Sequence, residues 1–293
     1  MEKLTYTNAN GQSVELGYRP PYMLQQFSGA GDLDFDVQVS KAPFQDGATF
    51  LDTLADVRDM SFRIALLAEN QLDLYERRRF LSTVFNPKLG KGELTYENDW
   101  LKKSIEVYLE GAPRYPTGTR NQKARYQNCL IQMTAVEPFW KDPMDMFSTL
   151  AAVMPLFEFE LEIATETDGI EMSSHSEGRI SIDNTGDVDA PLYFEFPGPV
   201  TNPRITNVTT GEFVELITPL DADETMIITT AFGNKTAMIV DSEGETQSAF
   251  QYLNLDSTFF QLVPGINELE FDAAAGSDEA TITIIYRRRY VGL

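Results

Sequence analysis

Runs in which apolar and polar residues alternate constrain this chain more than any other feature of its sequence. The longest covers residues 157–163, where Phe, Phe, Leu and Ile at odd positions alternate with Glu at even positions. Successive side chains of an extended strand point to opposite faces of a sheet, so this spacing predicts a strand with one buried and one solvated face.

Shorter runs repeat the pattern through the second half of the chain. Their apolar members lie at 180 and 182, at 192, 194 and 196, at 214 and 216, and at 280, 282, 284 and 286. Turn-forming segments at 184–186, 221–223 and 276–278 separate them, and no helix-length pattern lies between. Short strands at this spacing predict an antiparallel β-sandwich.

The first half combines strands with one helix. Apolar residues alternate with polar or small ones over 60–66, 105–109 and 129–135, which predicts three half-buried strands. The chain as a whole is therefore expected to be mainly β.

The helix is predicted over residues 70–85, between a capping Asn70 and the Asn86–Pro87 pair that ends it. At about 100° per residue, one stripe of this helix is apolar and suited to pack on a core. The stripe contains Leu74, Phe80, Leu81, Val84 and Phe85. Leu72 and Tyr75 point elsewhere, so either a loop covers them or they contact a neighbouring subunit.

A basic segment follows at residues 111–125, between two predicted strands. It contains Arg114, Arg120, Lys123 and Arg125 and no acidic residue. We expect a long hairpin tip, which is either solvated or docks onto an acidic surface of another subunit or partner. Tyr115 is the only aromatic residue among these charges, which disfavours RNA binding.

Charge divides the chain into two parts. The whole chain has 23 Lys+Arg against 45 Asp+Glu, a net charge of −22. Residues 1–142 have a net charge of −2 and residues 143–293 one of −20. We therefore expect two domains, 1–142 and 143–293, the alternative being one large domain with a charge gradient. An acidic protein of this kind is a poor candidate for independent binding to nucleic acid or to an anionic membrane.

Two further features concern the cellular compartment. The longest apolar run, residues 150–157, is eight residues long and contains Pro155, whereas a membrane-spanning helix needs about 20 residues. The chain has one cysteine, Cys129, and its first residues lack the apolar stretch of a signal peptide. We expect no membrane insertion and synthesis in a reducing cytosol.

Catalytic motifs are sparse. His175 is the only histidine and lies in a polar segment, so a His-based triad or metal cluster is not supported. Cys129 lies in a predicted strand and is interpreted as a buried structural thiol. The sequence has no GxSxG elbow and no glycine-rich phosphate loop after a strand.

Acidic clusters give no metal site either. Asp32, Asp34 and Asp36 resemble the start of a calcium loop, but Val37 and Pro43 occupy the positions that need Gly and Glu. The acidic residues at 183, 187 and 189 fit a β-turn better than a cation site. We therefore predict no catalytic residue, cofactor or metal, although a carboxylate pair for glycoside hydrolysis stays open because sequence gives no separations.

Several segments resemble the siphovirus-type phage tail component family, the distal tail proteins. The similar segments, given by their limits, are Phe44–Gly47, Ile64–Leu67, Glu76–Arg79, Asn86–Pro87, Gly92–Tyr96, Ile105–Leu109, Pro138–Trp140, Gly178–Gly186 and Ala280–Tyr286. They extend over nearly the whole chain.

The resemblance implies a structural protein and not an enzyme. Members form a ring, usually hexameric, at the distal end of a non-contractile tail, and this ring joins the tail tube to the hub and receptor-binding apparatus. The resemblance implies an N-terminal split β-barrel with one helix and a C-terminal galectin-like sandwich. It also implies a location in the virion and synthesis in the host cytoplasm, with DNA only passing through the channel.

Closed rings need heterologous contacts, in which one patch meets a different patch on the next copy. The residues expected to contribute to such patches are Leu72, Tyr75, Arg114, Arg120 and Lys123. The alternative function is a carbohydrate-binding adhesion module, in which aromatic side chains of the sandwich stack on sugar rings of the host surface. Both tryptophans, Trp100 and Trp140, lie in the first half, which disfavours it. A carbohydrate-cleaving enzyme ranks third.

Overall fold

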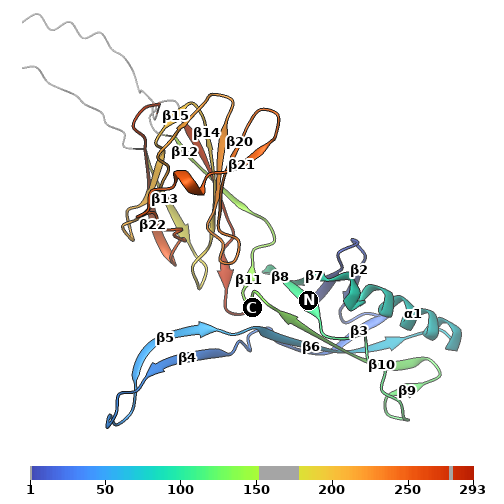
Figure 1. Cartoon of the computed structure of the whole chain (residues 1–293). Helices are drawn as coiled ribbons and strands as arrows, with labels where there is room; N and C mark the ends of the chain where they lie inside the picture. Colours follow the sequence, from blue (N-terminus) through green and yellow to red (C-terminus); the bar gives the residue numbers. More distant parts are fainter. Residues whose placement is uncertain (1, 152–177, 277–279) are drawn as a thin grey trace, which may run out of the picture. The chain divides into compact units, whose positions relative to one another are not determined.

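A computed structural model describes residues 2–151, 178–276 and 280–293 (Figure 1). The strand predicted at 157–163 and the lone His175 lie outside these ranges. The chain divides into two compact units: unit 1 is Met1–Pro143 with Arg289–Leu293, and unit 2 is Met144–Arg288. The last five residues thus belong to unit 1, whereas the sequence prediction placed them in the second domain.

Unit 1 is built on one antiparallel sheet, whose main path has the order β2-β1-β7-β8-β10-β6-β3. The strands are β1 (Lys3–Thr7), β2 (Ser13–Leu16), β3 (Tyr22–Ser28), β6 (Arg58–Leu67), β7 (Lys91–Glu97), β8 (Lys102–Leu109) and β10 (Tyr126–Ala135). Three short strands pair beside this path: β9 (Gln122–Lys123), β11 (Trp140–Lys141) and β24 (Arg289–Tyr290). The three strands predicted in the first half are confirmed as parts of β6, β8 and β10.

The two ends of this sheet approach each other without forming a ladder. Gly17, just after β2, makes a single parallel bridge with Met23 of β3. The amide of Leu24 donates to the Gly17 carbonyl at 2.8 Å, and the amide of Gly17 donates to the Tyr22 carbonyl at 3.3 Å. The sheet therefore curves into a barrel that stays open along most of this edge, as a split barrel does.

Helix α1 (Gln71–Val84) has the predicted caps, and a 3-10 turn η1 (Pro87–Leu89) follows it. The Asn70 side chain accepts from the Asp73 amide at 3.0 Å. Leu74, Leu81 and Val84 are buried against the sheet, as is the capping Phe85. The prediction for Phe80 was wrong: its side chain is 43% exposed, because it lies at the edge of the stripe, beside Tyr22.

Strands β4 (Phe35–Ser40) and β5 (Thr49–Ala55) form a separate two-stranded sheet, which we call the ribbon. The ribbon leaves the main sheet between β3 and β6 and extends away from it (Figure 1). A hydrogen bond from the Asp56 amide to the Asp34 carbonyl, 3.0 Å long, closes its base.

Unit 2 is an antiparallel sandwich. One sheet has the order β12-β23-β14-β19-β20-β21 and the other β13-β22-β16-β17. Their strands are β12 (Met146–Ala151), β13 (Arg179–Asn184), β14 (Leu192–Pro197), β16 (Arg204–Asn207), β17 (Glu212–Glu215), β19 (Thr225–Thr229), β20 (Thr236–Val240), β21 (Thr246–Ser248), β22 (Gly265–Asp272) and β23 (Thr281–Tyr286). A short pair, β15 (Val200–Thr201) with β18 (Pro219–Leu220), and the 3-10 turn η2 (Phe250–Tyr252) complete it.

One core fills the space between the two sheets of unit 2. Phe196 of β14 lies against Phe271 of β22, with ring centres 6.1 Å apart, and Phe194 of β14 lies 5.8 Å from Phe260. The predicted sandwich is confirmed, as is the mainly β fold: α1 is the only α-helix in the described ranges. No helix there has the length and apolar character needed to span a membrane.

Candidate assembly surfaces

The ribbon exposes large apolar side chains along most of its length. The apolar residues exposed on its strands and at its tip are Phe35 (43%), Val37 (54%), Val39 (56%), Phe44 (109%), Phe50 (62%), Leu51 (61%) and Leu54 (52%). Isolated exposed apolar residues are common on protein surfaces, but a contiguous group of this kind marks an interaction surface.

The pairing of β4 and β5 sorts these residues onto two faces. Residues directly opposite each other in an antiparallel pair share a face, and here Val37 lies opposite Thr53 and Val39 opposite Phe50. The apolar face of the ribbon therefore comprises Phe35, Val37, Val39, Phe50, Thr53 and Ala55. The opposite, polar face comprises Asp36, Gln38, Ser40, Thr49, Asp52 and Leu54.

The ribbon was not predicted from the sequence as a functional element. The signal was present, because Phe35, Val37 and Val39 alternate with Asp36 and Gln38. Nothing in such alternation distinguishes a face that packs on the chain's own core from one that packs on another molecule.

The two apolar residues of α1 that lie outside its buried stripe are exposed, Leu72 by 69% and Tyr75 by 48%. No loop among the described residues buries them, so that alternative loses its support. Beside them, the guanidinium of Arg78 lies 5.4 Å from the centre of the Tyr75 ring.

The basic segment folds back onto β10. Arg114 pairs with Leu130 through reciprocal backbone hydrogen bonds of 2.8 and 2.9 Å, and Lys123 lies in β9, which pairs with β10. Tyr115 attaches the segment to α1, since its hydroxyl donates to the Arg78 carbonyl at 2.8 Å. Arg114, Arg120 and Lys123 all remain exposed. Tyr75 and the start of the basic segment therefore both lie beside Arg78.

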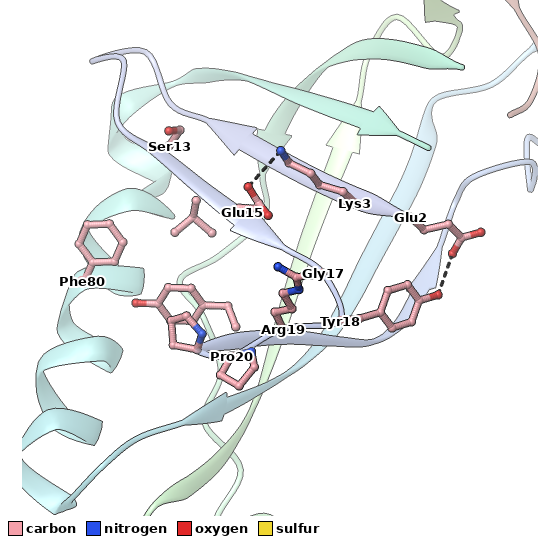
Figure 2. Close-up of a pocket in the computed structure, with 12 residues that line it drawn as sticks. Glu2, Lys3, Ser13, Glu15, Gly17, Tyr18, Arg19, Pro20 and Phe80 are labelled. Carbon is pink, nitrogen blue, oxygen red and sulfur yellow. Dashed lines mark hydrogen bonds and ion pairs between the residues drawn. The ribbon is translucent and has the colours of Figure 1, made fainter. Parts of the chain in front are cut away.

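An open pocket of about 480 Å³ lies where β1, β2 and the β2–β3 connection meet α1 (Figure 2). Lys3 pairs with Glu15 at 3.0 Å, and the Tyr18 hydroxyl donates to Glu2 at 3.4 Å, while Arg19 also lines the pocket. Phe80 of α1 closes one side. The pocket holds no nucleophile beside a base and no pair of free carboxylates.

Cys129 is a buried free thiol, as predicted. Burial raises the pKa of its thiol to about 12, and the smaller opposing effects of Arg78 and Tyr115 do not offset it. A thiol with such a pKa is protonated at neutral pH and is a poor nucleophile. Within the described ranges, no three His, Cys, Asp or Glu residues gather in a way that could hold a metal ion.

Unit 2 has a group of exposed aromatic side chains. Phe232 is 87% exposed and Phe250 47%. The ammonium of Lys235 lies 6.0 Å from the Phe232 ring centre and 5.8 Å from that of Phe259, which is itself 6.0 Å from Phe250. Two aromatic rings therefore lie beside one cation, and the third ring, that of Phe250, lies beside Phe259.

Two family models match the chain and together extend over most of it. The phage tail protein RIFT-related domain matches residues 9–135, and the siphovirus-type tail component C-terminal domain matches residues 185–290. A RIFT-related domain followed by this C-terminal domain defines a phage tail protein. The chain belongs to the siphovirus-type tail component family, the distal tail proteins of siphophages.

Solved structures show the same fold. The Dit protein (gp 19.1) of phage SPP1, described as a paradigm of the hub adsorption apparatus in phages that infect Gram-positive bacteria, is 11% identical with a TM-score of 0.67, over 98% of each chain. A chain of the phage P2 baseplate in its activated conformation with Ca is 9% identical with a TM-score of 0.55, over the full length of both chains. No curated protein matches. The family predicted from sequence is confirmed, and the protein is a structural component of the phage tail and baseplate.

Proposed function

We propose that this protein forms a homohexameric ring at the distal end of a siphophage tail, where it joins the tail tube to the tail-tip hub and receptor-binding proteins. Its role is structural, without catalysis or a cofactor. It works in the virion after synthesis in the host cytoplasm, and DNA passes through the ring without sequence-specific contact.

The apolar face of the ribbon is the observation that carries this proposal. Its four large members, Phe35, Val37, Val39 and Phe50, are each at least 43% exposed. A two-stranded sheet without a packed face is at best marginally stable in water. Burial of this face against another copy would supply the missing packing, at about 25 cal/mol for each Å² of apolar surface covered.

Light scattering combined with negative-stain imaging tests the ring. We expect a mass of several times 33.0 kDa and closed rings in the images. Val37→Asp should reduce the mass to that of one chain, because it places a carboxylate in the covered face. Val136→Asp is a matched control, since Val136 is 64% exposed and lies outside the ribbon. A 33.0 kDa wild-type protein at every concentration, without rings in the images, contradicts the proposal.

A second candidate, carbohydrate binding by unit 2, has support from the aromatic group around Lys235. Sugar rings stack on aromatic faces, and the ammonium would favour glycans with anionic substituents. Calorimetric titration of host wall polysaccharide should then show binding that Phe232→Ala abolishes and Trp100→Ala, an exposed aromatic of unit 1, leaves intact. Absence of binding by the wild-type protein would refute this second function.

A further inference from the structure

The outer face of the main sheet carries a row of side chains that crosses four neighbouring segments. Gln26 of β3 lies opposite Arg63 of β6, Arg63 lies opposite Leu130 of β10, and Leu130 is bridged to Arg114. These residues line a groove of about 220 Å³, together with Gln132 and Ser61. The groove therefore has two guanidinium groups, one exposed apolar side chain and two side-chain amides.

Neither arginine is neutralised within the part of the chain that the structure describes. Arg63 and Arg114 are exposed, and no carboxylate in that part forms an ion pair with either. Leu130, between them, is 39% exposed although it lies in a central strand. A solvated leucine flanked by two free cations is suited to a partner that offers two anions on either side of an apolar group.

The polar face of the ribbon has that composition. Asp36 lies opposite Leu54, and Asp52 lies opposite Gln38, two residues further along the same face. None of these carboxylates forms an ion pair among the described residues, and Leu54 is 52% exposed. The ribbon between residues 34 and 56 contains five aspartates and one lysine, so its charge is opposite to that of the groove.

The spacings are also compatible. Neighbouring strands lie about 4.8 Å apart, which places the backbones of Arg63 and Arg114, two strands apart, at about 10 Å. Diagonal pairs such as Asp36 and Asp52 lie about 7–8 Å apart. Arginine side chains are long enough to bridge the difference.

We propose that the polar face of the ribbon of one copy docks into the Arg63–Arg114 groove of the next copy. This inference rests on the proposed ring and specifies one of its contacts. No ribbon residue lines the groove of its own copy. The ribbon extends away from the main sheet (Figure 1). A contact between two different patches is heterologous, which is the type that generates rings. The apolar face of the ribbon is left for the burial against another copy that carries the proposed ring.

Charge reversal tests the docking. The first variant carries Asp36→Lys and Asp52→Lys, and the second carries Arg63→Glu and Arg114→Glu. Each should fall to the mass of one chain in light scattering at about 0.1 M salt, where charges about 10 Å apart still interact. An equimolar mixture should regain the ring mass, because each reversed ribbon then meets a reversed groove. A chain with all four changes should form rings alone.

Control variants separate this contact from general charge effects. Lys88→Glu with Lys102→Glu changes the net charge as the second variant does, at exposed sites outside the groove, and should leave the ring intact. The milder Arg63→Gln with Arg114→Gln, which preserves side-chain bulk, should still weaken the ring. Circular dichroism melting checks that each variant is folded.

The outcomes distinguish the docking from the ring itself. Rings formed by the second variant as readily as by the wild type would overturn the docking and leave the ring in place. So would a mixture that stays at the mass of one chain while the wild type forms rings. A wild-type protein that never exceeds 33.0 kDa contradicts both.

Discussion

The guanidinium of Arg78 lies 4.4 Å from the centre of the Tyr115 ring, and the Tyr115 hydroxyl donates a 2.8 Å hydrogen bond to the Arg78 carbonyl oxygen. Burial raises the pKa of the Tyr115 hydroxyl well above its ordinary value, so the group remains a donor throughout the physiological range. Helix α1 and the basic segment are therefore joined by a cation–π contact and a hydrogen bond at the same residue pair.

Tyr115→Phe removes the hydrogen bond and keeps the ring. We expect a loss of about 1 kcal/mol in the free energy of unfolding. Tyr115→Ala also removes the stacking surface and should release the segment, which hydrogen exchange of residues 111–125 would detect as faster exchange. Tyr108→Phe is the control, because Tyr108 is 41% exposed. Equal exchange in Tyr115→Ala and the wild type would show that this pair does not hold the segment.

The first turn of α1 should respond to acid through Asp73. Its carboxylate accepts from the Glu69 amide at 2.9 Å and pairs with Arg77 at 2.7 Å, and these contacts lower its pKa below the ordinary 3.8. For a carboxyl group with a lowered folded pKa, the stabilisation is present above the unfolded pKa and is lost as pH falls through the folded one. The protection factors of the first turn in hydrogen exchange should therefore fall below about pH 3.8 in the wild type, and Asp73→Asn should lack this step.

Local sequence signals predicted the elements that depend on local chemistry. Asn70 and the Asn86–Pro87 pair set the limits of α1 within a residue of those observed, and alternation located β6, β8, β10 and β14. Phe80 was misassigned, because a stripe on a helical wheel gives the direction of a side chain and not the extent of the sheet beneath it. The exposure of Leu72 and Tyr75 could be inferred in the same way.

Long-range relationships could not be derived from the pattern. Asp36 and Asp52 share a ribbon face only because β4 pairs with β5 in that register, and Arg63 meets Arg114 only through Leu130 of a third strand. The residues next to these four in the sequence give no indication of the pairings. Arg114, predicted as an interface residue, therefore gains a specific environment from the structure, whereas Arg120 and Lys123 remain predictions.

Substitution of the three predicted basic residues would separate their roles. If the basic segment contributes to assembly, Arg114→Glu, Arg120→Glu and Lys123→Glu together should reduce the ring mass measured by size exclusion with light scattering. Because Arg114 lies in the groove, Arg114→Glu alone should have a larger effect than Arg120→Glu with Lys123→Glu. An unchanged mass for the triple variant would refute a role of the segment in assembly.

Arg58 should be the most sensitive charged residue of unit 1. It is fully buried and donates to the carbonyl oxygens of Pro138 at 2.6 Å, Gly29 at 2.9 Å and Val291. Burial lowers the pKa of its guanidinium, and this group is the hydrogen-bond donor to three carbonyl oxygens. Arg58→Met should lower the free energy of unfolding by about 3 kcal/mol or more, because it leaves buried acceptors unpaired. Urea denaturation measures this, with the exposed Arg125→Met as the control, and a loss below about 1 kcal/mol would contradict it.

The reactivity of the Cys129 thiol reports whether unit 1 is folded. This thiol has a folded pKa of about 12, so native protein at pH 8 should resist iodoacetamide, whereas the urea-unfolded chain should react fully.

The same thiol should make the stability of the protein depend on pH. In the unfolded chain the pKa of the thiol is near 8.5. Because the folded pKa is raised, the contribution of the thiol to the free energy of unfolding is fully present below the unfolded pKa and is lost as pH rises towards the folded pKa. The free energy of unfolding should therefore fall by up to about 1.4 kcal/mol per pH unit above about pH 9. Cys129→Ala is less stable at pH 8 because of the lost packing, but its stability should decline less between pH 8 and 10 than that of the wild type. Parallel declines in the two proteins would show that this thiol is not shielded from water as the fold requires.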